Sequence, residues 1–225
     1  MSLATYKDLC IDAVDPLAEG AFWAQLLGWE LRPLDDGDAC LREDGTVRVW
    51  LNGVPEPTTV KNRLHLDVNA ESVDGVRALG ADIVDDTFPW TVMRDPDGQL
   101  FCVFVREEPI ERRPYELGWD VTGDADDAHR VAAWWQAVLG GTLEDDEQGY
   151  SWLGKVHELP FQGISFVPVP EVKTTKNRIH VDVQAQDLDG LLSHGATVLR
   201  KKGDGGIGWT VLADPFGNEF CAFTP

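Results

Sequence analysis

The sequence predicts an α+β fold built from two similar halves. The segment 61–68 (KNRLHLDV) recurs as 176–183 (KNRIHVDV), and Trp90-Thr91-Val92 recurs as Trp209-Thr210-Val211. Each half also shows, twice in succession, the pattern of a strand, a helix and several further strands. We therefore predict four βαβββ units, two in each half.

Helix-capping residues mark the predicted helices. Asp15 is suited to the N-cap of the first helix, Pro16 to its first turn and Gly28 to its end. The counterpart helix begins within 124–127 and ends at Gly140. Shorter helices are expected from Ser72 to Gly80 and from Asp187 to Gly195.

A charged segment bracketed by prolines separates the two halves. Residues 106–114 read REEPIERRP and show no apolar period. Such a composition is typical of a linker. We therefore predict one domain over 1–110 and a second over 114–225.

The composition indicates a soluble globular protein and argues against several partners. No apolar stretch approaches the ~20 residues that a membrane helix needs. No signal peptide is visible, and the four cysteines form no Cys-x-x-Cys pair, so we expect reduced thiols and a cytoplasmic location. The formal net charge of -20 disfavours binding to nucleic acid or to an anionic membrane. The same charge would attract a cationic ligand, although acidity also serves solubility.

One face of the repeated strand is polar. Apolar residues at every second position predict that the other face packs under helices. The predicted strands also carry large aromatic residues, which favour a lined concavity over a face turned to water. The polar row comprises Arg63, His65 and Asp67, and in the second half Arg178, His180 and Asp182. The aromatic candidates for ligand stacking are Trp50, Trp90, Trp152 and Trp209.

These features together resemble the vicinal oxygen chelate superfamily. The helices end in Leu-Gly, a histidine lies near the start of a strand, and each half closes with Asp-Pro-x-Gly at 95–98 and 214–217. The superfamily includes glyoxalase I, extradiol dioxygenases, fosfomycin resistance enzymes and bleomycin-binding proteins. The resemblance implies that the two units of each half form a cupped sheet around a pocket. It also implies a monomer whose halves pack like two subunits, with a homodimer as the alternative.

The resemblance implies a metal site that this chain matches only in part. His65 and His180 fall on the family's first-strand histidine, but Cys102 and Cys221 occupy the register of its last-strand glutamate. Glu219 lies two residues earlier, about 6.6 to 6.8 Å along the strand. The candidate metal ligands are His180, Glu116 and Glu219, with Asp8 near the remaining register. The two cysteines are interpreted as small buried apolar residues.

Three roles are open for the two histidines: metal ligand, hydrogen-bonded member of the polar row, or acid-base group oriented by the neighbouring aspartate. The arginines of the row either grip an anionic group of a ligand or pair with a nearby acid. Loops 35–38 and 144–147 are acidic and are expected to form a solvated rim.

We predict a small-molecule-binding protein of the bleomycin-resistance type, which holds a drug or cationic metabolite without the family's usual metal site. The alternative is a metal-dependent lyase, isomerase or dioxygenase acting on a small carbonyl or aromatic compound. It would use His180, Asp182 and Glu219, with a divalent ion as its cofactor. A third possibility is an interaction scaffold with vestigial pockets.

Overall fold

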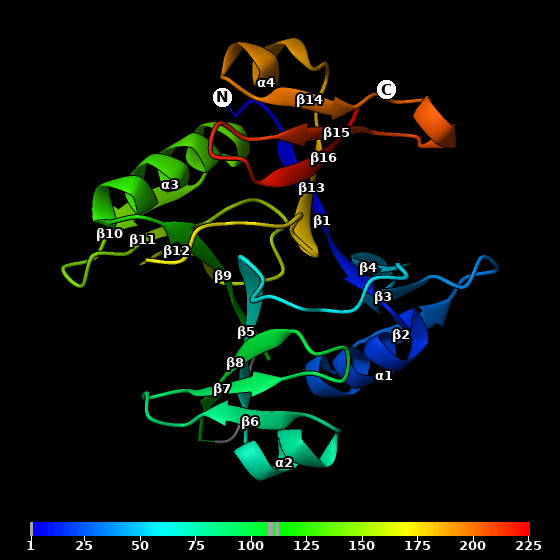
Figure 1. Ribbon diagram of the computed structural model, residues 1–225, viewed down its shortest axis with the longest axis vertical. Helices are drawn as coiled ribbons and strands as arrows, with labels where there is room; N and C mark the ends of the chain where they lie inside the picture. Colours follow the sequence, from blue (N-terminus) through cyan, green and yellow to red (C-terminus); the bar gives the residue numbers. More distant parts are fainter. Residues whose placement is uncertain (1, 108–109, 111–112) are drawn as a thin grey trace.

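The computed structural model describes residues 2–107, 110 and 113–225, which form four βαβββ units (Figure 1). The first unit comprises β1 (Thr5–Ala13), α1 (Pro16–Leu27), β2 (Glu30–Pro33), β3 (Ala39–Glu43) and β4 (Thr46–Gly53). The second comprises β5 (Leu64–Ala70), α2 (Val73–Ala78), β6 (Asp82–Asp85), β7 (Thr91–Arg94) and β8 (Leu100–Val105). The predicted order of elements is confirmed.

The second half repeats this order. Its first unit comprises β9 (Pro114–Thr122), α3 (Ala125–Leu139), β10 (Thr142–Asp145), β11 (Ser151–Gly154) and β12 (Gly163–Val169). Its last unit comprises β13 (Ile179–Gln184), α4 (Asp189–Ser193), β14 (Thr197–Arg200), the 3-10 turn η1 (Asp204–Gly206), β15 (Thr210–Ala213) and β16 (Glu219–Phe223). Four residues of the predicted linker, 108, 109, 111 and 112, lie outside the described residues.

The strands form two eight-stranded sheets, and each sheet takes one unit from each half. Sheet 1 has the order β14-β15-β16-β13-β1-β4-β3-β2, and sheet 2 has the order β10-β11-β12-β9-β5-β8-β7-β6. Figure 1 shows the blue strands of the first unit continuing into the orange and red strands of the last. The α+β class is confirmed.

The expected pairing of units within a sheet is wrong. We expected both units of one half to share a sheet, but β1 pairs with β13 and β5 pairs with β9, both antiparallel. The repeat relates β1 to β9 and β5 to β13, and it holds equally for either pairing of units, so it does not fix which first strands join. The ranges 1–110 and 114–225 describe the sequence repeat, and the division of the chain into two domains at these bounds stays a prediction.

The helix termini follow their capping residues. The side chain of Asp15 accepts hydrogen bonds from the backbone N–H groups of Leu17 and Ala18, and Gly28 ends α1 with φ 73°, a conformation that favours glycine. Asp124 caps α3, and Ser72 caps α2 as predicted. The expected cap of α4 is displaced by one residue, because Leu188 is the N-cap.

The tryptophans on the helices, Trp23, Trp134 and Trp135, lie in the core. Trp23 packs edge-on against Phe22 and Phe101, while Trp135 contacts Trp119 and Phe220. These contacts anchor α1 and α3 and leave the opposite face of each sheet to carry polar residues. None of the helices in the described ranges has the length and apolar character that crossing a membrane requires.

Candidate ligand pocket and two His-Asp-Cys clusters

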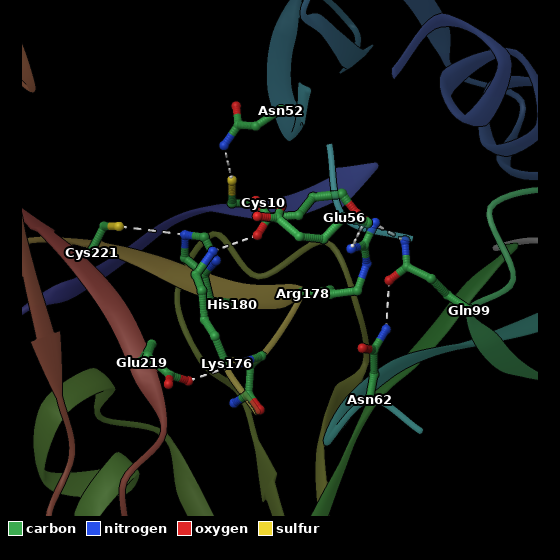
Figure 2. Close-up of polar contacts among 12 residues, drawn as sticks. Cys10, Asn52, Glu56, Asn62, Gln99, Lys176, Arg178, His180, Glu219 and Cys221 are labelled. Carbon is green, nitrogen blue, oxygen red and sulfur yellow. Dashed lines mark hydrogen bonds and ion pairs between the residues drawn. The ribbon is translucent and has the colours of Figure 1, made fainter. Parts of the chain in front are cut away.

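A histidine, an aspartate and a cysteine meet on each sheet. In sheet 1, His180 Nε2 lies 3.4 Å from Cys221 Sγ and 3.5 Å from Asp182 Oδ1, and Figure 2 shows the histidine–cysteine contact. In sheet 2, His65 Nε2 lies 3.3 Å from Asp67 Oδ1, and Cys102 completes the set. In each cluster one donor atom from every residue lies within 4.8 Å of the other two.

Strand pairing explains the convergence. His180 and Asp182 are two residues apart, so their side chains leave the same face of β13. The parallel neighbour β16 places Cys221 beside Asp182, and β8 places Cys102 beside Asp67 in the same way. The cysteines therefore belong to the candidate sites, and the interpretation of them as apolar filler missed this neighbourhood.

Each cluster also receives a carboxylate from the other half of the chain. Asp8 of β1 is the direct partner of Asp182, and Glu116 of β9 is the direct partner of Asp67. The predicted set that joined Glu116 to His180 is therefore wrong, because the two residues lie in different sheets. The cross-half strand pairing puts Asp8 in the place that we assigned to Glu116.

Glu219 reaches the pocket of His180 but has partners of its own. Its Oε1 accepts a hydrogen bond from Lys173 Nζ at 2.8 Å, and its Oε2 accepts one from the backbone N–H of Asn177 at 3.1 Å. The equivalent position in sheet 2 is Leu100, and the preceding Gln99, the counterpart of Asn218, accepts a hydrogen bond from Asn62 at 2.5 Å (Figure 2). Glu219 and Gln99 thus tie the closing hairpin of a unit to the loop before its first strand.

The side chains of Arg63 and Arg178 donate hydrogen bonds to residues of neighbouring loops. Arg63 Nη2 donates to the backbone oxygen of Glu171 at 2.6 Å. Arg178 donates to Asp97 Oδ2 at 2.8 Å and to the backbone oxygen of Glu56 at 2.7 Å (Figure 2). Of the two roles left open by the sequence, these contacts match pairing with nearby acceptors.

A cavity of about 520 Å³ lies over the polar face of sheet 1. Its floor includes His180 and Asp182, and its walls include the rings of Trp50, Trp209 and Phe223. Two of the four predicted stacking tryptophans therefore line the pocket that contains the cluster.

The same place on sheet 2 is filled by its own side chains. The ring of Trp152 covers Gly154 and Gly163 so closely that a Cβ atom on either glycine would lie 2.4 or 2.5 Å from it. His65 covers Gly118 in the same way, at 2.3 Å. Trp90 stacks on Phe88, with ring centroids 5.2 Å apart.

Three differences between equivalent strand positions explain this asymmetry. Where sheet 1 has Lys7, Cys10 and Cys40, sheet 2 has Tyr115, Gly118 and Trp152. The rings of Tyr115 and Trp152 occupy part of the concavity of sheet 2. Gly118 has no side chain, which allows the ring of His65 to lie over it. The predicted ligand contacts His65, Asp67, Trp90 and Trp152 therefore all lie on the filled sheet.

The sequence analysis missed several pocket residues, among them Lys7 and Asn52. Lys7 Nζ hydrogen-bonds to Asp8 Oδ2 at 2.5 Å and lies 4.1 Å from the centre of the Phe223 ring. Asn52 donates to Cys10 Sγ at 2.7 Å (Figure 2). Neither residue recurs at the equivalent position of the other sheet, so the repeat offered no signal for them.

The histidines of the two clusters have pKa values shifted in opposite directions. Burial, followed by the charge of Lys176, lowers the pKa of His180 to about 3. Burial and the neighbouring Asp8 raise the pKa of Asp182 well above its usual value. In sheet 2 burial also opposes protonation of His65, but the charge and hydrogen bonding of Asp67, together with Cys102, outweigh it and raise the pKa of His65 well above its usual value. Sheet 1 thus presents a neutral imidazole, and sheet 2 an imidazolium.

The clusters fit a divalent metal ion that accepts sulfur. Asp8 Oδ1, Asp67 Oδ1 and Asp182 Oδ1 are buried and accept no hydrogen bond of good geometry. Buried polar atoms normally have partners, so these oxygens are available to a metal ion. An imidazole, a carboxylate and a thiol are also an accepted ligand set for such an ion.

The comparisons identify the family and the fold. The family model described as "Glyoxalase-like domain" matches residues 8–104 and 120–223. Glyoxalase I from Zea mays is 16% identical with a TM-score of 0.66, over 98% of this chain and 92% of that chain. A putative dioxygenase from Bacillus subtilis is 12% identical with a TM-score of 0.56, over 100% of this chain and 86% of that chain.

At these identities the solved structures show a shared fold and no shared activity. The search of curated proteins finds no match. The two family matches together cover most of the chain and coincide with the two sequence repeats. The resemblance to the vicinal oxygen chelate superfamily is confirmed, and the chain belongs to the glyoxalase-like domain family.

Proposed function

We propose that the protein binds a small molecule in the pocket over sheet 1. The observation that carries the proposal is the cavity of about 520 Å³, walled by aromatic rings above a polar floor. This volume falls within the roughly 300–1,000 Å³ of sites for drug-sized ligands, and such sites combine apolar walls with a few polar groups in this way.

The lining favours a planar ligand that is neutral or positively charged. Trp50 and Trp209 offer aromatic faces for stacking. Asp36 and Asp38 lie on one wall, where their recorded hydrogen bonds are to backbone N–H groups. Backbone N–H groups leave the negative charge of these carboxylates available to a ligand cation.

Ligand titration of two matched tryptophan variants tests this proposal. Trp209 lines the pocket, and Trp90 is its repeat counterpart on the filled sheet. We would titrate planar aromatic amines by calorimetry and tryptophan fluorescence in the presence of a chelator. Trp209→Phe should weaken the affinity of the best compound about tenfold, a loss of about 1.4 kcal/mol. Trp90→Phe should leave it unchanged.

Equal effects of the two substitutions would contradict a site on sheet 1, and absence of binding across the panel would contradict the ligand class. Circular dichroism of both variants would show that the fold is retained.

A second candidate function is a metal-dependent lyase, isomerase or dioxygenase, favoured by the position of the His180–Asp182–Cys221 cluster at the pocket floor. These residues would hold the ion, which when bound would act as a Lewis acid on a carbonyl or hydroxyl oxygen. The neutral imidazole of His180 is already in the form that binds metal. Metal analysis of untagged protein tests this function, and His180→Ala should lose metal if the pocket cluster is the working site.

A further inference from the structure

Donor spacing within the clusters matches coordination of a single ion. Around a tetrahedral zinc ion with metal–nitrogen and metal–sulfur bonds of about 2.1 and 2.3 Å, the nitrogen and sulfur atoms are about 3.6 Å apart. A nitrogen and a carboxylate oxygen in the same geometry are about 3.4 Å apart. The observed distances from His180 Nε2 are 3.4 Å to Cys221 Sγ and 3.5 Å to Asp182 Oδ1. The side chains need little movement to share an ion.

The three residue types are identical in the two sheets although their surroundings differ. Cys10 faces His180 where Gly118 faces His65, and Trp50 on one sheet corresponds to Ser165 on the other. One sheet has an open pocket and the other is filled. Apolar filling alone does not require a cysteine in both settings, whereas a shared ligand set does.

Each cluster also has a carboxylate positioned as a fourth donor. Asp8 adjoins Asp182, and its Oδ1 is buried without a hydrogen-bond partner. Its other oxygen, Oδ2, accepts a hydrogen bond from Trp50 Nε1 at 2.9 Å and is paired with Lys7. These contacts orient the free oxygen, as outer contacts orient ligands in known metal sites. Glu116 adjoins Asp67 in sheet 2.

We propose that both clusters bind a thiophilic divalent ion of the zinc type, with Cys221 and Cys102 as thiolate ligands in place of a carboxylate. Thiolate favours zinc and similar ions, whereas magnesium and manganese prefer all-oxygen ligands. When the metal bonds form, each thiol loses its proton to solvent, and the imidazolium of His65 loses one as well. The inference concerns the identity of the ion and rests on neither candidate function.

The sheet 1 cluster borders the open pocket, so its ion can retain a position for a water molecule or a ligand, as catalytic zinc sites do. The residues of the two clusters are buried to a similar degree: the side chains of His180 and Asp182 are 8% and 6% exposed, and those of His65 and Asp67 are 14% and 9% exposed.

Cobalt substitution tests the proposal without an activity assay. Co²⁺ bound to a thiolate gives a near-ultraviolet charge-transfer band, which it lacks with oxygen and nitrogen ligands alone. The wild-type chain should bind two equivalents with this band. Cys221→Ser and Cys102→Ser should each lose one equivalent and about half of the band.

Cys40→Ser is the matched control, because Cys40 is buried on β3 outside both clusters and should retain both equivalents. Failure to take up Co²⁺ or Zn²⁺, or uptake without the charge-transfer band, would overturn the proposal. The wild-type spectrum decides this even if a serine variant fails to fold. The ligand titration is carried out in the presence of a chelator, so its outcome does not depend on metal binding. Either proposal can therefore fail while the other holds.

Discussion

Asp8, from the first half of the chain, lies directly opposite Asp182, from the second half, on the antiparallel strands β1 and β13. Both carboxyl groups are buried, and Asp182 lines the candidate pocket. The equivalent pair in sheet 2 is Glu116 with Asp67. The candidate pocket and both His-Asp-Cys clusters therefore lie on sheets that are built from both halves of the chain.

Residues 1–110 expressed alone should not form a folded monomer. The half would contain the first strands β1 and β5 without their partners β13 and β9, and each unpaired edge would expose hydrogen-bonding groups and core side chains. We expect aggregation or self-association in size-exclusion chromatography. Co-expression with residues 114–225 should restore a soluble 1:1 complex.

A folded monomeric half, with native-like circular dichroism and a cooperative melting transition, would contradict the cross-half assembly of the sheets. The full chain measured in the same buffer is the control.

Glu19→Gln should make the protein more stable at neutral pH. Glu19 accepts a hydrogen bond from Trp23 Nε1 at 2.7 Å. Burial and the neighbouring Asp95 raise the pKa of Glu19 well above its usual value, and burial raises the pKa of Asp95 to about 6. A glutamine keeps an acceptor for the indole without an ionisable group. We expect a gain of about 1–3 kcal/mol at pH 8, the scale of the cost of a buried polar group that lacks full hydrogen bonding.

The raised pKa values of Glu19 and Asp95 determine how the free energy of unfolding changes with pH. Both folded-state pKa values lie above the unfolded ones, so the protonated pair contributes stability at low pH, and this contribution is lost as the pH rises through about 6. Urea unfolding of the wild type should show a decline between pH 4 and pH 7, and the variant should show a smaller decline. Parallel pH profiles for the wild type and the variant would contradict the raised pKa of Glu19.

Gly163→Ala should destabilise the protein through a clash with Trp152. The added Cβ atom would lie 2.5 Å from the indole ring, which must shift out of its position over the strand. Overpacking of this kind costs about 1–3 kcal/mol. Urea unfolding gives the free energy of each variant.

A double-mutant cycle separates this clash from a general effect on β12. In the Trp152→Ala background the Gly163→Ala substitution should cost almost nothing, because the ring is absent. An equal cost in both backgrounds would show that Trp152 does not occupy the concavity of sheet 2.

The sequence predicted features that depend on local patterns or on the repeat. The alternation around His65 and His180 correctly placed each histidine on the same strand face as its aspartate, and the family register correctly brought Cys102 and Cys221 to the last strands. Asp15 and Ser72 identified helix starts because capping is a local interaction.

Features that depend on non-local pairing were missed. Whether β1 joins β5 or β13 is decided by contacts between units, so Glu116 was grouped with His180 although it lies beside Asp67. The filled state of sheet 2 depends on Trp152 and Tyr115, at positions where sheet 1 has Cys40 and Lys7. A single tryptophan in a strand does not reveal whether it lines a cavity or fills one.

The most direct test of the account is a crystallographic soak with small planar aromatic compounds. The pocket over sheet 1 should show bound compound between Trp50 and Trp209, above His180, while Trp152 stays over Gly163 on sheet 2. Compound bound above His65 on sheet 2, with the sheet 1 pocket empty, would contradict the assignment of the ligand site.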